Sequence, residues 1–186
     1  MLTPSKEILS ASIMKQNRSI EHMTQANRYK ELAALTKRAD TLDPAYHAAF
    51  YLLSYDPELY ETARRFVNVD GIGFTGIKWA TRDYDERTRF VIDIAHNLFS
   101  YNSACKATPF EISRLGYPYL EMVCNSFYIA TGEVQVVLEP GQDRQLGIRL
   151  DDSRYQQNRR IQQKIEQFQK SMIADMVQDE ATEPER

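Results

Sequence analysis

Four residues that favour the N-cap position of a helix are each followed directly by proline. The four pairs are Thr3-Pro4, Asp43-Pro44, Asp56-Pro57 and Thr108-Pro109. At the N-cap, a Thr or Asp side-chain oxygen accepts a hydrogen bond from a free backbone N–H of the first turn. Proline suits the next position, because the N–H that it lacks would have no partner there. These pairs predict helix starts throughout the chain, and therefore a mainly α fold.

Composition agrees with long elements and few turns. Glycine occurs seven times in 186 residues, well below its usual share of roughly 7%. Hydrophobic residues make up 42% of the chain, enough for one sizeable core. The apolar runs, such as 48–53, are far shorter than the ~20 residues of a membrane span. We therefore expect no membrane association, and the absence of an apolar leader predicts a cytoplasmic protein.

Apolar residues at helical spacing predict one helical-bundle-like domain over residues 1–130. Helices are expected over 4–16, 24–38, 44–54, 57–66 and 83–101, with two more that start at Pro109 and Pro118. The 44–54 helix is apolar on nearly all sides, which predicts a central, buried position. Four tyrosines in this helix and the next are interpreted as filling the core rather than forming a recognition surface: Tyr46, Tyr51, Tyr55 and Tyr60.

The periodicity changes after residue 130. Apolar and polar residues alternate over 133–139 and again over 145–150, with Pro140-Gly141 between the two runs. This pattern predicts a β-hairpin within 131–150, with an extended linker as the alternative. A long polar helix, the arm, is expected over 151–177, followed by a disordered acidic tail over 178–186.

A thin apolar seam runs along the predicted arm. Its members alternate spacings of four and three residues, which covers about two heptads: Ile161, Ile165, Phe168 and Met172. Such a seam suits packing on the domain or pairing with a second copy of the chain. It is shorter than the three or four heptads that identify a coiled coil from sequence.

Charge is distributed unevenly around a net value of −3. Residues 39–140 hold eight basic and fourteen acidic side chains, whereas 141–170 hold seven basic and four acidic ones. A basic group on the arm, together with Tyr155, is a candidate contact for nucleic acid or an acidic protein surface: Arg154, Arg159, Arg160 and Lys164. Because the excess is small and an acidic tail follows, a solvated helix face is the favoured interpretation.

Catalytic and cofactor motifs find little support. The segment 71–76 matches G-x-G-x-x-G, but no alternating strand–helix pattern surrounds it, so we expect a flexible loop and no cofactor. The three histidines and two cysteines lack metal-ligand spacing, which predicts no metal site. His96 follows Asp93 by three residues on a predicted helix and is interpreted as a boundary residue with a local hydrogen bond. Cys105, beside Lys106, is a loop thiol without an identified base.

Two side-chain expectations accompany the predicted helices. Cys124, in an apolar helix, is expected to be buried as a small hydrophobe. Arg89 and Asp93 are spaced for an ion pair on the solvent face of their helix.

Residues 43–130 resemble a family of small uncharacterised helical proteins from Gram-positive bacteria and their mobile elements. The segments that carry the resemblance are 43–54, 56–60, 94–99 and 108–112. The resemblance implies an α-helical domain of bacterial or phage origin, and it supplies no catalytic residues.

Taken together, these patterns predict a non-enzymatic protein-interaction module that binds a protein partner or forms a homodimer through the arm. Two alternatives stay open. One is a nucleic-acid-binding accessory protein that uses the basic arm. The other is an enzyme with a pocket near His96 or Cys105.

Overall fold

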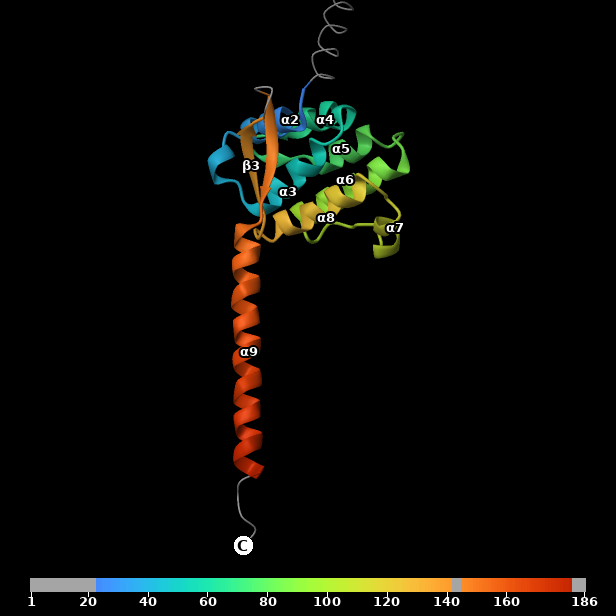
Figure 1. The fold of residues 1–186 in the computed structure, drawn as a ribbon. Helices are drawn as coiled ribbons and strands as arrows, with labels where there is room; N and C mark the ends of the chain where they lie inside the picture. Colours follow the sequence, from blue (N-terminus) through green and yellow to red (C-terminus); the bar gives the residue numbers. More distant parts are fainter. Residues whose placement is uncertain (1–22, 142–144, 182–186) are drawn as a thin grey trace, which may run out of the picture.

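The computed structural model describes residues 23–141 and 145–181, with side chains in the last helix described as far as residue 174. The predicted helix over 4–16 and its Thr3-Pro4 start lie outside these residues. The mainly α prediction is confirmed (Figure 1). The domain contains these helices: α2 (Gln25–Leu35), α3 (Pro44–Leu53), α4 (Pro57–Ala63), α5 (Phe74–Ala80), α6 (Glu86–Phe99), α7 (Pro109–Ser113) and α8 (Tyr119–Ala130). Short 3-10 turns occur at Ala39–Thr41 and Arg64–Phe66.

The predicted cap–proline pairs start three of these helices. Asp43 accepts a hydrogen bond from the Tyr46 N–H at 3.0 Å, and Asp56 accepts one from Leu59 at 2.8 Å. Thr108 caps α7 in a reciprocal capping box with Glu111. The side chains of Thr24 and Asp85 cap α2 and α6 in the same way. Local capping chemistry therefore places most helix starts of the domain.

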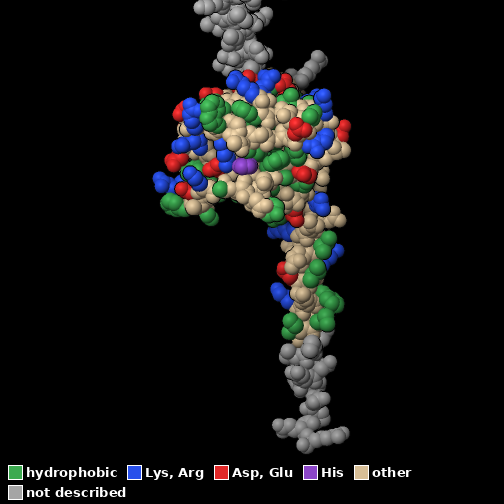
Figure 2. All heavy atoms as spheres, turned by 180° about the vertical axis from the view of Figure 1, so that it is seen from behind, with side chains coloured by type: hydrophobic (Ala, Val, Ile, Leu, Met, Phe, Trp, Pro, Cys, Tyr) green, Lys and Arg blue, Asp and Glu red, His purple; other side chains and the backbone are tan. Residues whose placement is uncertain are grey.

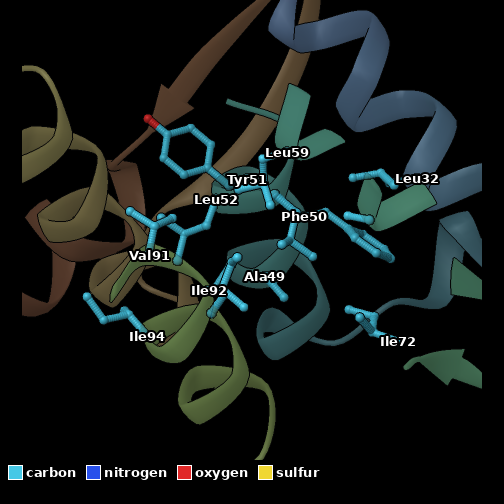
Figure 3. Close-up of a cluster of buried hydrophobic side chains, with 14 of the residues drawn as sticks. Leu32, Ala49, Phe50, Tyr51, Leu52, Leu59, Ile72, Val91, Ile92 and Ile94 are labelled. Carbon is cyan, nitrogen blue, oxygen red and sulfur yellow. The ribbon is translucent and has the colours of Figure 1, made fainter. Parts of the chain in front are cut away.

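The core forms around α3, as its all-round apolar character predicts. Residues 48–53 are all buried, and α6 and α8 pack against α3. Figure 3 shows Phe50 and Leu52 of α3 among side chains from neighbouring elements, with Ile92 of α6 close to Ala49. The core-filling interpretation of the tyrosines is confirmed: Tyr51 and Tyr60 are buried, and Tyr46 and Tyr55 are half-buried against the core.

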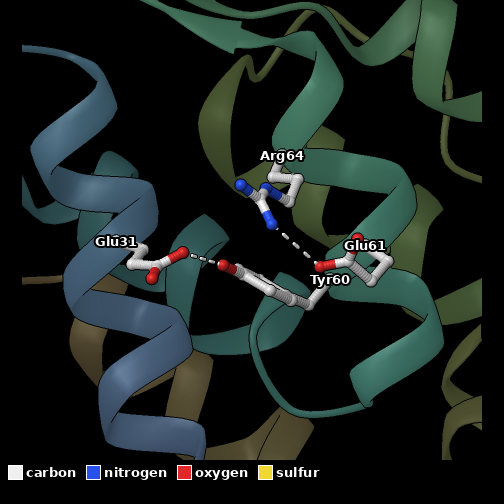
Figure 4. A network of polar contacts seen from close by, with 4 residues as sticks. All are labelled: Glu31, Tyr60, Glu61 and Arg64. Atoms are coloured by element: carbon white, nitrogen blue, oxygen red, sulfur yellow. Dashed lines mark hydrogen bonds and ion pairs between the residues drawn. The ribbon is translucent and has the colours of Figure 1, made fainter. Parts of the chain in front are cut away.

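Two polar groups join α2 to the helices beside it. The buried guanidinium of Arg28 donates hydrogen bonds to the carbonyls of Ser54 and Tyr55, both at 2.7 Å, just past the end of α3. The hydroxyl of buried Tyr60 donates to the carboxylate of Glu31, while Arg64 pairs with Glu61 at 3.1 Å (Figure 4). These bonds satisfy carbonyl and hydroxyl groups that burial would otherwise leave unpaired.

The glycine segment 71–76 is not the flexible loop that we expected. Strands β1 (Val67–Asn68) and β2 (Gly71–Ile72) pair antiparallel, and α5 begins at Phe74. Gly76 lies under the ring of Phe66, where an added Cβ would sit 2.4 Å from a ring carbon. Helix α5 packs so closely on the Phe66 ring that position 76 has no room for a side chain, which explains the glycine there.

Three smaller expectations are also corrected. Helix α2 ends at Leu35 rather than near residue 38, because Lys37 adopts a left-handed conformation with φ 54°. Asp93 pairs with Lys78 of α5 at 2.7 Å instead of with Arg89. Cys124 is exposed, since α8 turns Met122, Val123, Ser126 and Ile129 toward the core.

A hairpin and a long helix complete the chain. Strands β3 (Gln135–Pro140) and β4 (Leu146–Asp151) pair antiparallel with Val136 opposite Leu150 and Leu138 opposite Ile148. The hairpin prediction is confirmed and the linker alternative is wrong. Thr24 donates to the carbonyl of Leu146 at 2.9 Å, which ties the hairpin to the start of α2.

Helix α9 (Ser153–Ala181) extends away from the domain as a single arm (Figure 1). It passes the predicted end at 177, because acidic residues do not stop a helix and the first proline after it is Pro184. The rest of the predicted tail, 182–186, lies outside the described residues. Within the described part of the chain, none of the helices is both long and apolar enough to span a membrane.

Candidate functional site: the C-terminal arm

The first two turns of α9 fix the arm to the domain. The carboxylate of Asp151 accepts hydrogen bonds from the backbone N–H and hydroxyl of Ser153, at 3.0 and 2.6 Å, and these bonds lower the pKa of Asp151. Asn158 donates to Glu133 at 3.1 Å. Tyr155 packs edge to face on Tyr128 of α8. Tyr155, predicted as a binding residue, is therefore half-buried and serves to anchor the arm.

Beyond Asn158, no hydrogen bond or ion pair between described residues joins α9 to the domain. The seam lies entirely in this free part. Its side chains are 45–65% exposed, and Ile173 nearby is 62% exposed: Ile161, Ile165, Phe168 and Met172. Figure 2 shows hydrophobic side chains along the arm with no other part of the domain over them. We expected the seam either to pack on the domain or to pair with a second copy of the chain. The exposure of these residues excludes packing on the domain.

The predicted basic residues do not share one face of the arm. Lys164 lies three residues after Ile161 and four before Phe168, so it borders the seam. Arg160, one turn earlier, lies on the same border. Arg159 is two residues before Ile161 and points to the opposite side of the helix. All three are exposed, and the structure does not gather them into a continuous basic stripe.

The arm has a charge gradient along its length. Residues 153–170 contain five basic side chains and one acidic one, and residues 171–181 contain three acidic side chains and no basic one. The end next to the domain is therefore positive and the far end is negative.

A cavity lies where the arm joins the domain, on the same side of α9 as the seam. Arg154 lies seven residues before Ile161, two helical turns earlier on the same face. Its guanidinium lines a cavity of about 280 Å³ together with Pro44, His47, Ile129 and Val136. A second helix packed along the seam and extending toward the domain would therefore contact Arg154, beside this cavity.

His96 and Cys105 lie away from the arm, and neither lines the cavity of about 510 Å³ to which the neighbouring residues Ala104 and Lys106 contribute. The His96 ring stacks on Phe74 with centroids 4.6 Å apart, and burial, together with Lys78, lowers its pKa. Its Nδ1 is buried and has no hydrogen-bond partner among the described residues. The expected local hydrogen bond is therefore missing at that atom, and the ring is stacked on Phe74. Cys105 is an exposed loop thiol.

The fold and the arm define a small helical domain that carries a projecting amphipathic helix. Comparison of the chain with protein-family models, curated proteins and solved structures finds no match.

Proposed function

We propose that this protein is a non-enzymatic interaction module that forms a homodimer through antiparallel pairing of its α9 arms. The observation that supports this most strongly is the exposed seam from Ile161 to Met172 on a helix that stands clear of its own domain. The two exposed thiols, Cys105 and Cys124, suit a reducing compartment such as the cytoplasm.

An isolated helix gains too little from its own backbone hydrogen bonds to account for such a length. Most helical stability in proteins comes from packing of an apolar face against another element. The arm has 29 residues, and its domain covers only the first two turns. A second copy of the same seam supplies the missing apolar partner, and spacings of four and three residues let two such helices interlock.

The charge gradient selects the antiparallel orientation. Antiparallel arms place the positive half of each helix beside the negative half of the other. Parallel arms would place like-charged halves together, which is unfavourable.

The spacing of the seam also sets the register. In an antiparallel pair centred on the seam, Ile161 lies opposite Met172 of the second copy, and Ile165 lies opposite its Phe168. All four seam positions of each chain are then covered, whereas a shift by one heptad would leave half of them in water.

The oligomeric state of the full chain tests the pairing. We expect a dimer by light scattering, and a monomer when Ile165→Asp and Phe168→Asp are combined. The matched control combines Gln163→Asp with Gln167→Asp, which adds the same charge to the solvent side of the arm and should leave the dimer intact. A monomeric wild-type chain, or equal dissociation of both variants, would overturn the proposal.

Disulfide cross-linking tests the orientation. In a background where Cys105 and Cys124 are serine, chains with Ile161→Cys are mixed with chains carrying Met172→Cys and oxidised. Antiparallel arms cross-link in the mixture and not in either chain alone. Cross-linking of the Ile161→Cys chain with itself would show a parallel pair and refute the proposed orientation.

A further inference from the structure

A second cavity, of about 510 Å³, lies on the domain between α5, α6 and the loop around residue 105. Four basic side chains line it: Lys78, Arg82, Arg89 and Lys106. Its apolar lining includes Phe90 and Ile92 of α6. The basic groups come from α5, the turn after it, α6 and the loop before α7, so the fold assembles them and no run of the sequence predicts them. Figure 2 shows Lys and Arg side chains along the edge of the domain farthest from the arm.

The cavity is electropositive in an otherwise acidic part of the chain. Its lining contains two carboxylates, those of Glu86 and Asp93, and Asp93 is already paired with Lys78 at 2.7 Å. Arg89 and Lys106 are exposed, and none of the ion pairs among described residues involves them. Residues 39–140 as a whole hold eight basic and fourteen acidic side chains. The local excess of cations therefore favours an anionic ligand against the charge of the surrounding domain.

Arg82 lines the cavity, and its side chain lies beside the exposed ring of Trp79. The guanidinium of Arg82 sits 4.8 Å from the centre of the Trp79 ring, and the Trp79 side chain is 69% exposed. Exposed tryptophan and arginine faces are surfaces on which aromatic rings stack. An apolar wall, stacking faces and free cations together fit a ligand that carries an aromatic ring next to its negative charge.

We propose that this cavity binds a small aromatic phosphate of the mononucleotide class. Arg89 and Lys106 contact the phosphate, and the aromatic ring lies against Phe90 and the guanidinium of Arg82, beside Trp79. A cavity of this size is within the range of small-ligand pockets. The proposal is independent of the pairing of the arms, since no residue of α9 lines the cavity.

Intrinsic fluorescence tests this directly, because Trp79 is the only tryptophan in the chain. The full-length protein is titrated with AMP, with adenosine and with inorganic phosphate, and calorimetry of the same mixtures excludes optical artefacts. We expect saturable binding of AMP that weakens with added salt, and much weaker binding of adenosine and of phosphate alone. Absence of saturable AMP binding at millimolar concentration would overturn the proposal, as would equal affinity for AMP and either fragment.

A matched pair of variants locates the site. Arg89→Ala combined with Lys106→Ala should lower AMP affinity at least about tenfold, since each removes a charged contact from the proposed phosphate position. Both residues are exposed, so we expect unchanged circular dichroism. Arg159→Ala with Arg160→Ala removes the same charge from the arm and should leave the affinity unchanged. Equal losses in the two variants would show non-specific attraction and refute the site.

Discussion

Tyr128 of α8 and Tyr155 of α9 meet edge to face, with ring centroids 5.4 Å apart and planes at 70°. This contact joins the last helix of the domain to the first turn of the arm. It holds the direction in which the arm leaves the domain, together with the Asp151–Ser153 turn.

Replacing Tyr155 with alanine should loosen the root of the arm without unfolding the domain. An aromatic pair contributes about 0.5–1.5 kcal/mol beyond its buried area. We therefore expect amide hydrogen exchange in the first two turns of α9 to become roughly two- to tenfold faster. Tyr155→Phe is the control, because no hydrogen bond among described residues uses the Tyr155 hydroxyl. Unchanged exchange in the alanine variant would contradict the anchoring role.

Replacing Tyr60 with phenylalanine removes a hydrogen bond while keeping a fully buried ring. The lost bond goes to the carboxylate of Glu31, and bonds to charged groups contribute about 1.5–3 kcal/mol. We expect the free energy of unfolding in urea to fall by an amount in this range. A double-mutant cycle with Glu31→Ala gives the coupling between the two side chains. Additive losses in that cycle would show that the bond contributes nothing to stability.

The buried guanidinium of Arg28 should not tolerate lysine. It donates to the carbonyls of Ser54 and Tyr55 at once, and a lysine ammonium cannot reproduce this planar fork. We expect Arg28→Lys to cost about 2–4 kcal/mol in urea unfolding, because a buried carbonyl loses its donor. Arg65→Lys, at an exposed position, should change stability by less than about 0.5 kcal/mol. Similar values for both variants would contradict this role of Arg28.

Stability should decrease in mild acid because of the partly buried histidines. Burial lowers the pKa of His47 below its ordinary value of 6.5, and its ring is hydrogen-bonded to the Tyr29 hydroxyl. As pH falls through 6.5, the unfolded chain binds a proton that the folded chain accepts only at lower pH. The free energy of unfolding should therefore fall between about pH 7 and pH 5. His47→Gln should make this dependence shallower, whatever its effect at pH 7, and an identical slope would argue against the assignment.

Local chemistry explains how far the sequence predicts the fold. The Asp43, Asp56 and Thr108 caps are short-range signals, and each marks a helix start found in the structure. The two-residue strands at Val67 and Gly71 are too short for a periodic signal, so the small hairpin was not predicted. The exposed position of Cys124 was missed because α8 is apolar around much of its surface and periodicity does not distinguish its faces.

The two proposed sites also differ in how far the sequence predicts them. The seam from Ile161 to Met172 is a pattern within one helix, and its spacing alone predicts it. The basic cavity combines Lys78 of α5 with Lys106 of the loop before α7, and its assembly depends on how α5 packs on α6. The Asp93–Lys78 ion pair was missed for that reason, since the spacing within α6 favoured Arg89.

The length of the arm has a geometric consequence. At 1.5 Å per residue, the 29 residues of α9 span about 43 Å. Antiparallel arms of this length place the two domains at opposite ends of a rod, related by a two-fold axis across its middle. In the proposed dimer the paired arms act as a spacer, and whatever each domain binds is held on the order of 40 Å from its counterpart.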